Sequence, residues 1–118
     1  MKNPMTISEF QSVIRTFCDE RDWQQFHNPK DLAIGISTEA NELLELFRFK
    51  NQTETTQLMS DKAEAVANEL SDVFFYVLRF ADLYQIDLTE AFLHKMDINA
   101  RHYPAAKVKG SNKKYNEL

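Results

Sequence analysis

Two pairs of acidic residues lie in the two most apolar stretches of the sequence, and the members of each pair are three residues apart. The pairs are Glu39 with Glu42 and Glu69 with Asp72. On a helix that turns about 100° per residue, Glu39 falls inside the apolar arc of its stretch, and Glu69 falls between aromatic residues of its own. Because unpaired carboxylates are costly in apolar surroundings, this placement predicts a positive group between the two pairs.

Acidic pairs at this spacing also occur on solvent-exposed helix faces, and the chain has 18 Asp and Glu among its 118 residues. Surface pairs, however, lie opposite the core of an amphipathic helix, whereas Glu39 and Glu69 do not. We therefore interpret Glu39, Glu42, Glu69 and Asp72 as candidate catalytic and metal-ligating residues.

Four carboxylates without a histidine form a hard oxygen site, which suits Mg²⁺, with Mn²⁺ as a substitute, better than zinc or copper. A di-iron site needs Glu-x-x-His on two helices, and none of the three histidines follows an acidic residue at that spacing. Magnesium usually recruits substrate phosphates as further ligands. The site therefore predicts a nucleotide substrate and hydrolysis of a phosphoanhydride, without the glycine-rich loop of the common nucleotide-binding motif.

The composition favours helices around these residues. With two glycines, three prolines and 43% hydrophobic residues, the chain is typical of a single all-α domain. The net charge of −4 disfavours a nucleic-acid partner. No signal peptide or membrane-spanning stretch is present, so we expect a cytoplasmic protein without a membrane partner. The single cysteine, Cys18, falls on an apolar helical stripe and is expected to be a buried thiol.

Capping patterns divide the chain into four expected helices. They run from Thr6 to about Arg21, from Asn28-Pro29 to about Lys50, from Ser60 to about Gln85, and from Asp87 to about Ala100. Polar residues 51–59 are interpreted as a loop. We expect one helical domain over residues 1–104 and a lysine-containing tail over residues 105–118. The third helix is apolar almost all round at residues 73–77, which predicts a subunit interface.

Three motifs resemble those of the MazG-like nucleoside triphosphate pyrophosphohydrolases, and most closely those of the dCTP pyrophosphatase branch. They are Glu39-Ala-Asn-Glu42, Glu69-Leu-Ser-Asp72 and the segment from Lys95 to Pro104. The likeness extends over nearly the whole chain, including residues 23–29 and 113–118. It implies a four-helix-bundle-like MazG fold in which helices from both subunits of a dimer complete the core, within a homodimer or homotetramer.

The resemblance also implies a reaction. A nucleoside triphosphate, dCTP-like or a noncanonical deoxynucleotide, is cleaved between its α- and β-phosphates to a monophosphate and pyrophosphate, with the four acidic residues as Mg²⁺ ligands. The implied role is nucleotide-pool house-cleaning. Two alternatives stay open. One is a relative acting on dUTP, dUDP or phosphoribosyl-ATP, and the other is a noncatalytic helical interaction module.

Six further residues are implied as substrate-binding. Two aromatic residues would surround the base and the others would contact the nucleotide; the six are Trp23, Phe49, Tyr76, Lys95, Asn99 and Tyr103. The ordinary alternative for each is a packed ring or a surface polar residue. The chain departs from the dCTP enzymes at Phe49, where they have tryptophan, and at Ile14, where they have histidine. Both departures concern base selectivity.

Overall fold

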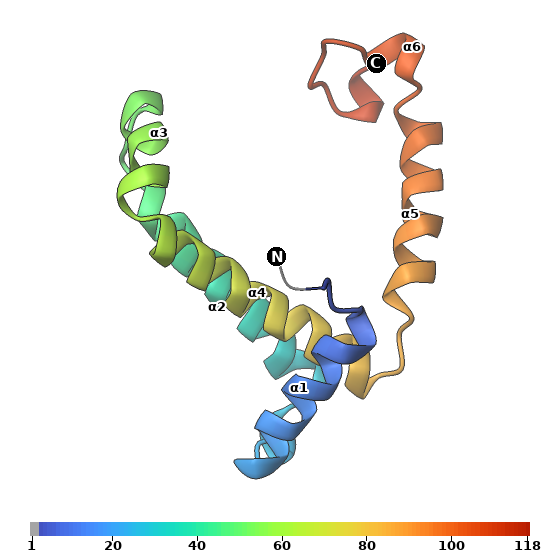
Figure 1. The fold of residues 1–118 in the computed structure, drawn as a ribbon. Helices are drawn as coiled ribbons and strands as arrows, with labels where there is room; N and C mark the ends of the chain where they lie inside the picture. Colours follow the sequence, from blue (N-terminus) through green and yellow to red (C-terminus); the bar gives the residue numbers. More distant parts are fainter. Residues whose placement is uncertain (1–2) are drawn as a thin grey trace. The chain divides into compact units, whose positions relative to one another are not determined.

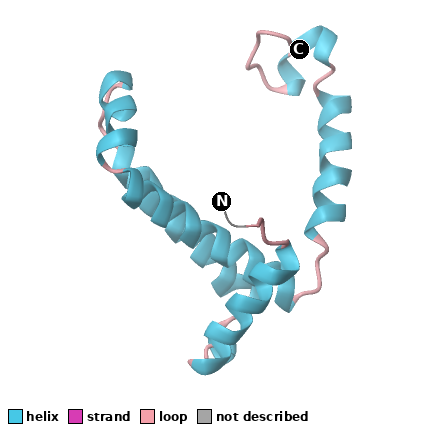
Figure 2. Cartoon of the chain, in the orientation of Figure 1, coloured by secondary structure: helices cyan, strands magenta, loops and turns pink. Residues whose placement is uncertain are grey.

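The computed structural model describes residues 3–118, and all regular structure in that range is helical (Figures 1 and 2). The helices are α1 (Ile7–Glu20), α2 (Pro29–Phe47), α3 (Gln52–Asp61), α4 (Ala63–Leu83), α5 (Leu88–His102) and α6 (Ala105–Val108), with short 3-10 segments η1 (Gln24–Phe26) and η2 (Tyr115–Glu117). This confirms the all-α class. In the same range, no helix is long and apolar enough to cross a bilayer.

The chain divides into two compact units. The first ends at Tyr84 and contains α1 to α4, and the second, Gln85–Leu118, contains α5, α6 and η2. The predicted division into a domain to residue 104 and a tail stays a prediction.

Three of the helices begin at the residues that the capping patterns indicate. Thr6 and Glu9 form the expected reciprocal box at α1, and Asn28 accepts a hydrogen bond from the Asp31 backbone N–H ahead of Pro29. Asp87 caps α5 by accepting from the backbone N–H of Glu90. Such caps satisfy the free donors of a first helical turn and each stabilise a helix by about 1 kcal/mol.

The expected loop over residues 51–59 is wrong, because these residues form most of α3. Asn51 and Glu54 form a capping box that starts the helix, and Leu58 is buried in the core. Ser60 therefore lies inside α3 rather than at the start of the next helix, and α4 begins after Lys62. The polar, threonine-rich composition concealed a helix that is stabilised by its cap and by a single buried leucine.

The first unit is organised around α4. Helix α2 packs along it in the antiparallel direction, and α1 and α3 also contact it (Figure 1). The buried core residues are Ile14, Cys18, Leu32, Leu58, Val66, Leu78 and Ala81, together with the buried Arg79. The prediction for Cys18 is confirmed.

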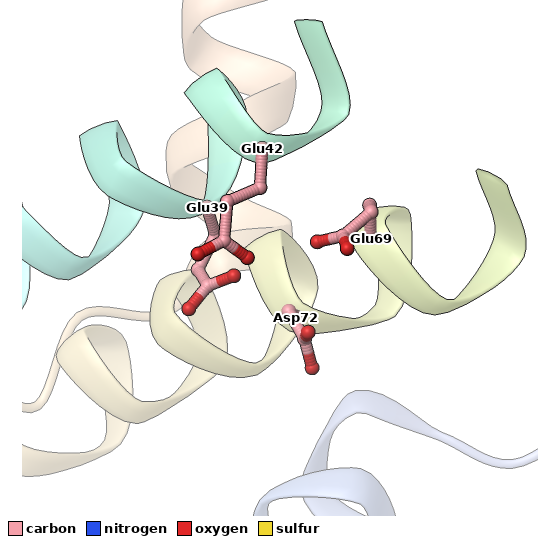
Figure 3. Close-up of side chains that lie close together, drawn as sticks. All are labelled: Glu39, Glu42, Glu69 and Asp72. Carbon is pink, nitrogen blue, oxygen red and sulfur yellow. The ribbon is translucent and has the colours of Figure 1, made fainter. Parts of the chain in front are cut away.

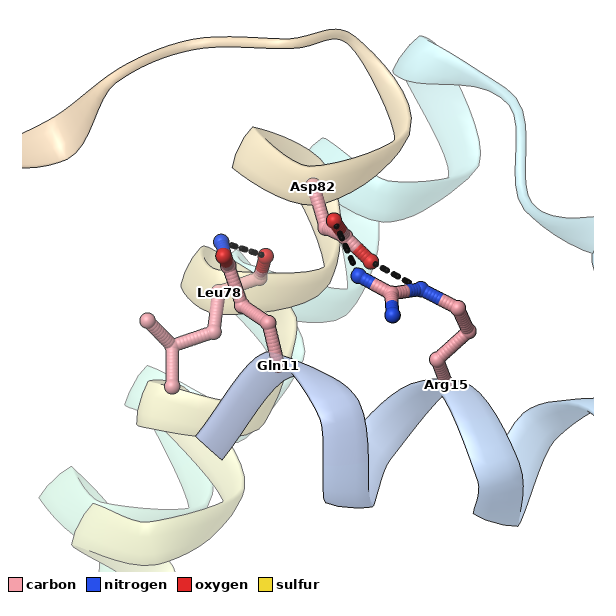
Figure 4. A network of polar contacts seen from close by, with 4 residues as sticks. All are labelled: Gln11, Arg15, Leu78 and Asp82. Carbon is pink, nitrogen blue, oxygen red and sulfur yellow. Dashed lines mark hydrogen bonds and ion pairs between the residues drawn. The ribbon is translucent and has the colours of Figure 1, made fainter. Parts of the chain in front are cut away.

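Polar contacts hold α1 against the last turns of α4 (Figure 4). The Arg15 guanidinium donates two hydrogen bonds, of 3.1 and 2.8 Å, to the two carboxylate oxygens of Asp82. The Gln11 amide donates to the carbonyl oxygen of Leu78 at 3.1 Å. These bonds fix the end of α4 that lies opposite α3.

Candidate functional site

The four acidic residues meet where α2 and α4 run side by side. Glu39 and Glu42 project from α2, Glu69 and Asp72 project from α4, and the two pairs face each other across the helix contact (Figure 3). One carboxylate oxygen from each residue lies within 4.8 Å of the corresponding oxygens of the other three. The predicted convergence of the two pairs is therefore present in the fold.

Helices α2 and α4 approach each other closely at Gly35 and Tyr76, about one turn before Glu39 on α2 and one turn after Asp72 on α4. The ring of Tyr76 lies so near Gly35 that a Cβ atom at position 35 would be 2.5 Å from Tyr76 Cε1. Glycine leaves room for the ring, which is half-buried beside the acidic cluster. Burial first, and then the charges of Glu39 and Asp72, raise the pKa of the Tyr76 hydroxyl.

Glu39 and Glu69, the inner members of the two pairs, are the carboxylates of the site whose pKa values are raised. Glu39 and Glu69 are half-buried, and one oxygen of each, Oε2, is buried without a hydrogen-bond partner among residues 3–118. Burial and the neighbouring Glu42 carboxylate raise the pKa of Glu39 to about 7. The same two causes, in the same order, raise the pKa of Glu69.

This arrangement fits a divalent cation. A buried oxygen without a partner is costly, and the neighbouring carboxylates disfavour the ionised forms of Glu39 and Glu69. A cation held by carboxylates from both helices would satisfy the two orphaned oxygens and balance the charge. The cluster contains no histidine or cysteine, so its ligand chemistry suits hard cations. The cluster can therefore bind a metal ion.

The aromatic residues expected around a base lie at the ends of helices. Phe49 follows the last turn of α2 with a positive φ of 64°. Its ring is 91% exposed, and the Arg48 guanidinium lies 4.6 Å from the ring centroid. Trp23 lies just before η1, where its indole packs edge-to-face against Phe17. An exposed aromatic ring in a left-handed backbone conformation is unusual and is consistent with binding, but the role of both rings stays a prediction.

The other predicted substrate-binding residues belong to the second unit. Lys95 is exposed on α5, Asn99 lies one turn further along the helix, and Tyr103 is the residue at which the helix ends. The Tyr103 ring packs edge-to-face on Tyr115. Their role in a nucleotide site stays a prediction.

Sequence reasoning missed one buried polar pair in the first unit. Arg79 lies in the apolar part of α4 and donates from Nε to Nδ1 of His27 at 3.0 Å. One signal was present in the sequence: an arginine stands between Leu78 and Phe80 in a run of apolar residues.

Comparison with known proteins places this geometry in a family. The MazG-like family model matches residues 34–118. dCTP pyrophosphatase 1 of Homo sapiens is 41% identical over 96% of this chain and 68% of its own length, and the Mus musculus protein of the same name is 38% identical over the same shares. A solved pyrophosphatase from Archaeoglobus fulgidus superposes with a TM-score of 0.80 at 34% identity, covering 88% of this chain and 97% of its own. The chain belongs to the MazG-like family.

Proposed function

We propose that this protein is a Mg²⁺-dependent pyrophosphohydrolase that cleaves dCTP, or a dCTP-like or noncanonical deoxynucleotide, to a monophosphate and pyrophosphate. The enzyme class, nucleoside triphosphate pyrophosphohydrolase, follows from family membership and from curated and solved relatives that are named as pyrophosphatases. The observation that carries the proposal is the four-carboxylate cluster with two buried, unpartnered oxygens at the α2–α4 contact.

The chain supplies the ligands and the orientation for this chemistry. Glu39, Glu42, Glu69 and Asp72 would hold the ion on two packed helices, so that its position is fixed relative to the substrate. When bound, Mg²⁺ supplies neutralisation of phosphate charge and a bound water of lowered pKa. In the overall reaction water is added across the phosphoanhydride between the α- and β-phosphates: the water oxygen bonds to one of these two phosphorus atoms, the bond from that phosphorus to the bridging oxygen breaks, and the monophosphate and pyrophosphate separate. The protons of the water pass to the products and the solvent.

The remaining proposed contacts concern the nucleotide. Trp23 and Phe49 offer flat apolar faces on which a base can stack, as aromatic side chains do for unstacked bases. Lys95 offers a point charge for phosphate, and Asn99 and Tyr103 offer polar groups. We assign these residues to substrate binding on the resemblance of their motifs.

The protein is further proposed to act as a homodimer or homotetramer. Helix α5 carries three large apolar side chains that are largely exposed within its unit, Phe92 (63%), Leu93 (62%) and Met96. Phe74, in the apolar run of α4, is also exposed. Exposed apolar side chains of this kind are typical of a face that is covered by another subunit.

A substrate panel tests the assignment. Initial rates with dCTP, CTP, dTTP, dUTP, dUDP and phosphoribosyl-ATP are measured with Mg²⁺, with Mn²⁺ and with EDTA. The proposal predicts the highest kcat/KM for dCTP with Mg²⁺. It predicts lower activity when Mn²⁺ replaces Mg²⁺, and no activity in EDTA. A preference for dUTP, dUDP or phosphoribosyl-ATP would move the protein to another branch of the enzymes. No turnover of any nucleotide would favour the interaction module.

A further inference from the structure

Arg79 is a fully buried cation outside the acidic cluster. It is 1% exposed, and none of the ion pairs among residues 3–118 includes it. Its Nη2 atom is buried without a hydrogen-bond partner in the same part of the chain. A guanidinium stays charged in proteins and is costly to bury without a counter-charge. A side chain of this kind needs a reason other than fold stability.

The contacts of Arg79 and of the end of α4 converge on one short segment. Arg79 Nε donates to His27 Nδ1 at 3.0 Å, and the hydroxyl of Tyr84 donates to the carbonyl oxygen of His27 at 3.4 Å. The end of α4 therefore holds both the side chain and the backbone of His27. Because His27 ends the η1 turn and directly precedes the cap of α2, these bonds fix the connection between α1 and α2.

The same connection carries Trp23. The backbone N–H of Trp23 donates to the carbonyl oxygen of Cys18 at 3.0 Å, which ties its main chain to α1. Its indole packs edge-to-face against His27, with ring centroids 6.3 Å apart, and against Phe17, with centroids 5.4 Å apart. The imidazole that Arg79 holds is thus one of two rings that set the orientation of the indole.

We infer that Arg79 is a positioning residue of the nucleotide site: acting through the His27 imidazole, it holds the Trp23 indole in one orientation for stacking on the base. The inference rests on the proposed function for the use of Trp23, while the Arg79–His27–Trp23 arrangement itself stands on the contacts above. Pre-ordering a ring before the ligand arrives lowers the entropy lost on binding, so the arrangement favours substrate affinity.

The electrostatics are consistent with this role. To accept a hydrogen bond at Nδ1, the His27 imidazole must be neutral. Burial and the charge of Arg79 both lower its pKa. The facing groups are Arg79 and Tyr84 from α4, and Cys18 of α1 also lies in the field of Arg79. Arg79 therefore donates its hydrogen bond to the neutral imidazole, and its charge also favours that neutral form.

The chain offers a direct probe, because Trp23 is its only tryptophan. Imidazolium quenches a neighbouring indole, so a pH titration of Trp23 fluorescence in the absence of ligand reports on His27. In the native protein we expect a midpoint below 6.5. In Arg79→Met, which keeps the volume but removes the charge and the donor, we expect the midpoint to rise and the emission maximum to shift to longer wavelength. His27→Gln should abolish the titration.

Arg15→Gln is the matched control. It removes an arginine that also bridges to α4, through Asp82, but that is half-exposed and makes no contact with His27. We expect its fluorescence titration to equal that of the native protein. Circular dichroism of each variant at the same concentration establishes that it is folded.

Steady-state kinetics with dCTP and Mg²⁺ separate positioning from a general structural effect. Arg79→Met should raise KM about tenfold and change kcat less than about twofold. His27→Gln keeps an acceptor for Arg79 but removes the imidazole against which the indole packs, and His27→Leu removes both. Each should therefore raise KM, and His27→Leu should do so by about as much as Arg79→Met.

The outcomes are distinguishable. If folded Arg79→Met retains the native fluorescence titration and the native KM, the inference is overturned. The same holds if Arg79→Met lowers kcat with KM unchanged, or if His27→Gln and His27→Leu both retain the native KM. Should the native protein hydrolyse no nucleotide, the proposed function fails, and so does the assignment of Arg79 to a nucleotide site, while the fluorescence result still decides whether Arg79 holds the indole.

Discussion

The metal-free protein should lose stability as Glu39 ionises, and Glu39→Gln should remove that loss. The folded protein raises the pKa of Glu39 from 4.5 to about 7, so between these values the folded state binds more protons than the unfolded state. Stability must then fall as pH rises from about 4.5 to about 7 and level off above it.

The magnitude follows from the separation of the two pKa values. Each pH unit between them corresponds to about 1.4 kcal/mol, which sets an upper limit of about 3.5 kcal/mol for the interval between 4.5 and about 7. Glu42 and Asp72 are exposed, and water screens their charges. We therefore expect about 1 to 2 kcal/mol, or about 4 to 8 °C in Tm for a chain of this size.

Thermal unfolding followed by circular dichroism in EDTA checks this expectation. Native protein and Glu39→Gln are compared at pH 4.5 and pH 8 at one protein concentration, because the stability of an oligomer depends on concentration. Glu39→Gln should have a higher Tm than the native protein at pH 8 and a similar Tm at pH 4.5. Adding Mg²⁺ at pH 8 should raise the Tm of the native protein and have little effect on the variant.

Glu45→Gln is the control for this experiment. Glu45 lies on the same helix but outside the cluster, where it pairs with Arg48 on the surface, so its substitution should leave the difference between the two pH values unchanged. If the Tm values of Glu39→Gln and Glu45→Gln depend on pH in the same way as that of the native protein, the raised pKa of Glu39 is not the cause of the loss of stability, and the reasoning is refuted.

Three further predictions concern other parts of the account. Glu69→Gln should lower kcat/KM at least about a hundredfold, because a metal ligand is lost, while the exposed Glu64→Gln on the same helix should not; equal kinetics of the two would contradict the site. Phe49→Ala should raise KM about tenfold if the exposed ring stacks on the base, with no change in Tm; an unchanged KM would leave the ring without that role. Asn51→Ala should cost about 1 kcal/mol of stability in urea unfolding through loss of the α3 cap, and a smaller loss than that of a surface control such as Gln57→Ala would show that the cap does not stabilise the helix.

The convergence of the two acidic pairs was predictable because its signal lies in periodicity. Glu39 and Glu69 interrupt the apolar faces of two amphipathic helices, and the cap of the first, Asn28, is clear in the sequence. Antiparallel contact between two such helices brings the interruptions together. The convergence of the pairs therefore follows from local pattern and one packing contact.

The fold departs from prediction where stability comes from contacts that local composition does not reveal. Residues 51–59 are polar and rich in threonine, yet the Asn51 cap and the burial of Leu58 against α4 make them helical. The Arg79–His27 bond joins residues 52 positions apart, so only the packed structure brings them together. Helix α2 likewise ends at Phe47 rather than near Lys50, because the backbone leaves the helical region at Arg48 and Phe49 then takes a left-handed conformation.

Phosphorus NMR of the products formed from dCTP directly tests whether the four-carboxylate site carries out metal-dependent release of pyrophosphate. The four-carboxylate site in this fold predicts dCMP and pyrophosphate in the presence of Mg²⁺, and unreacted dCTP in EDTA. Formation of dCDP and orthophosphate, or the same products at the same rate in EDTA, would contradict it.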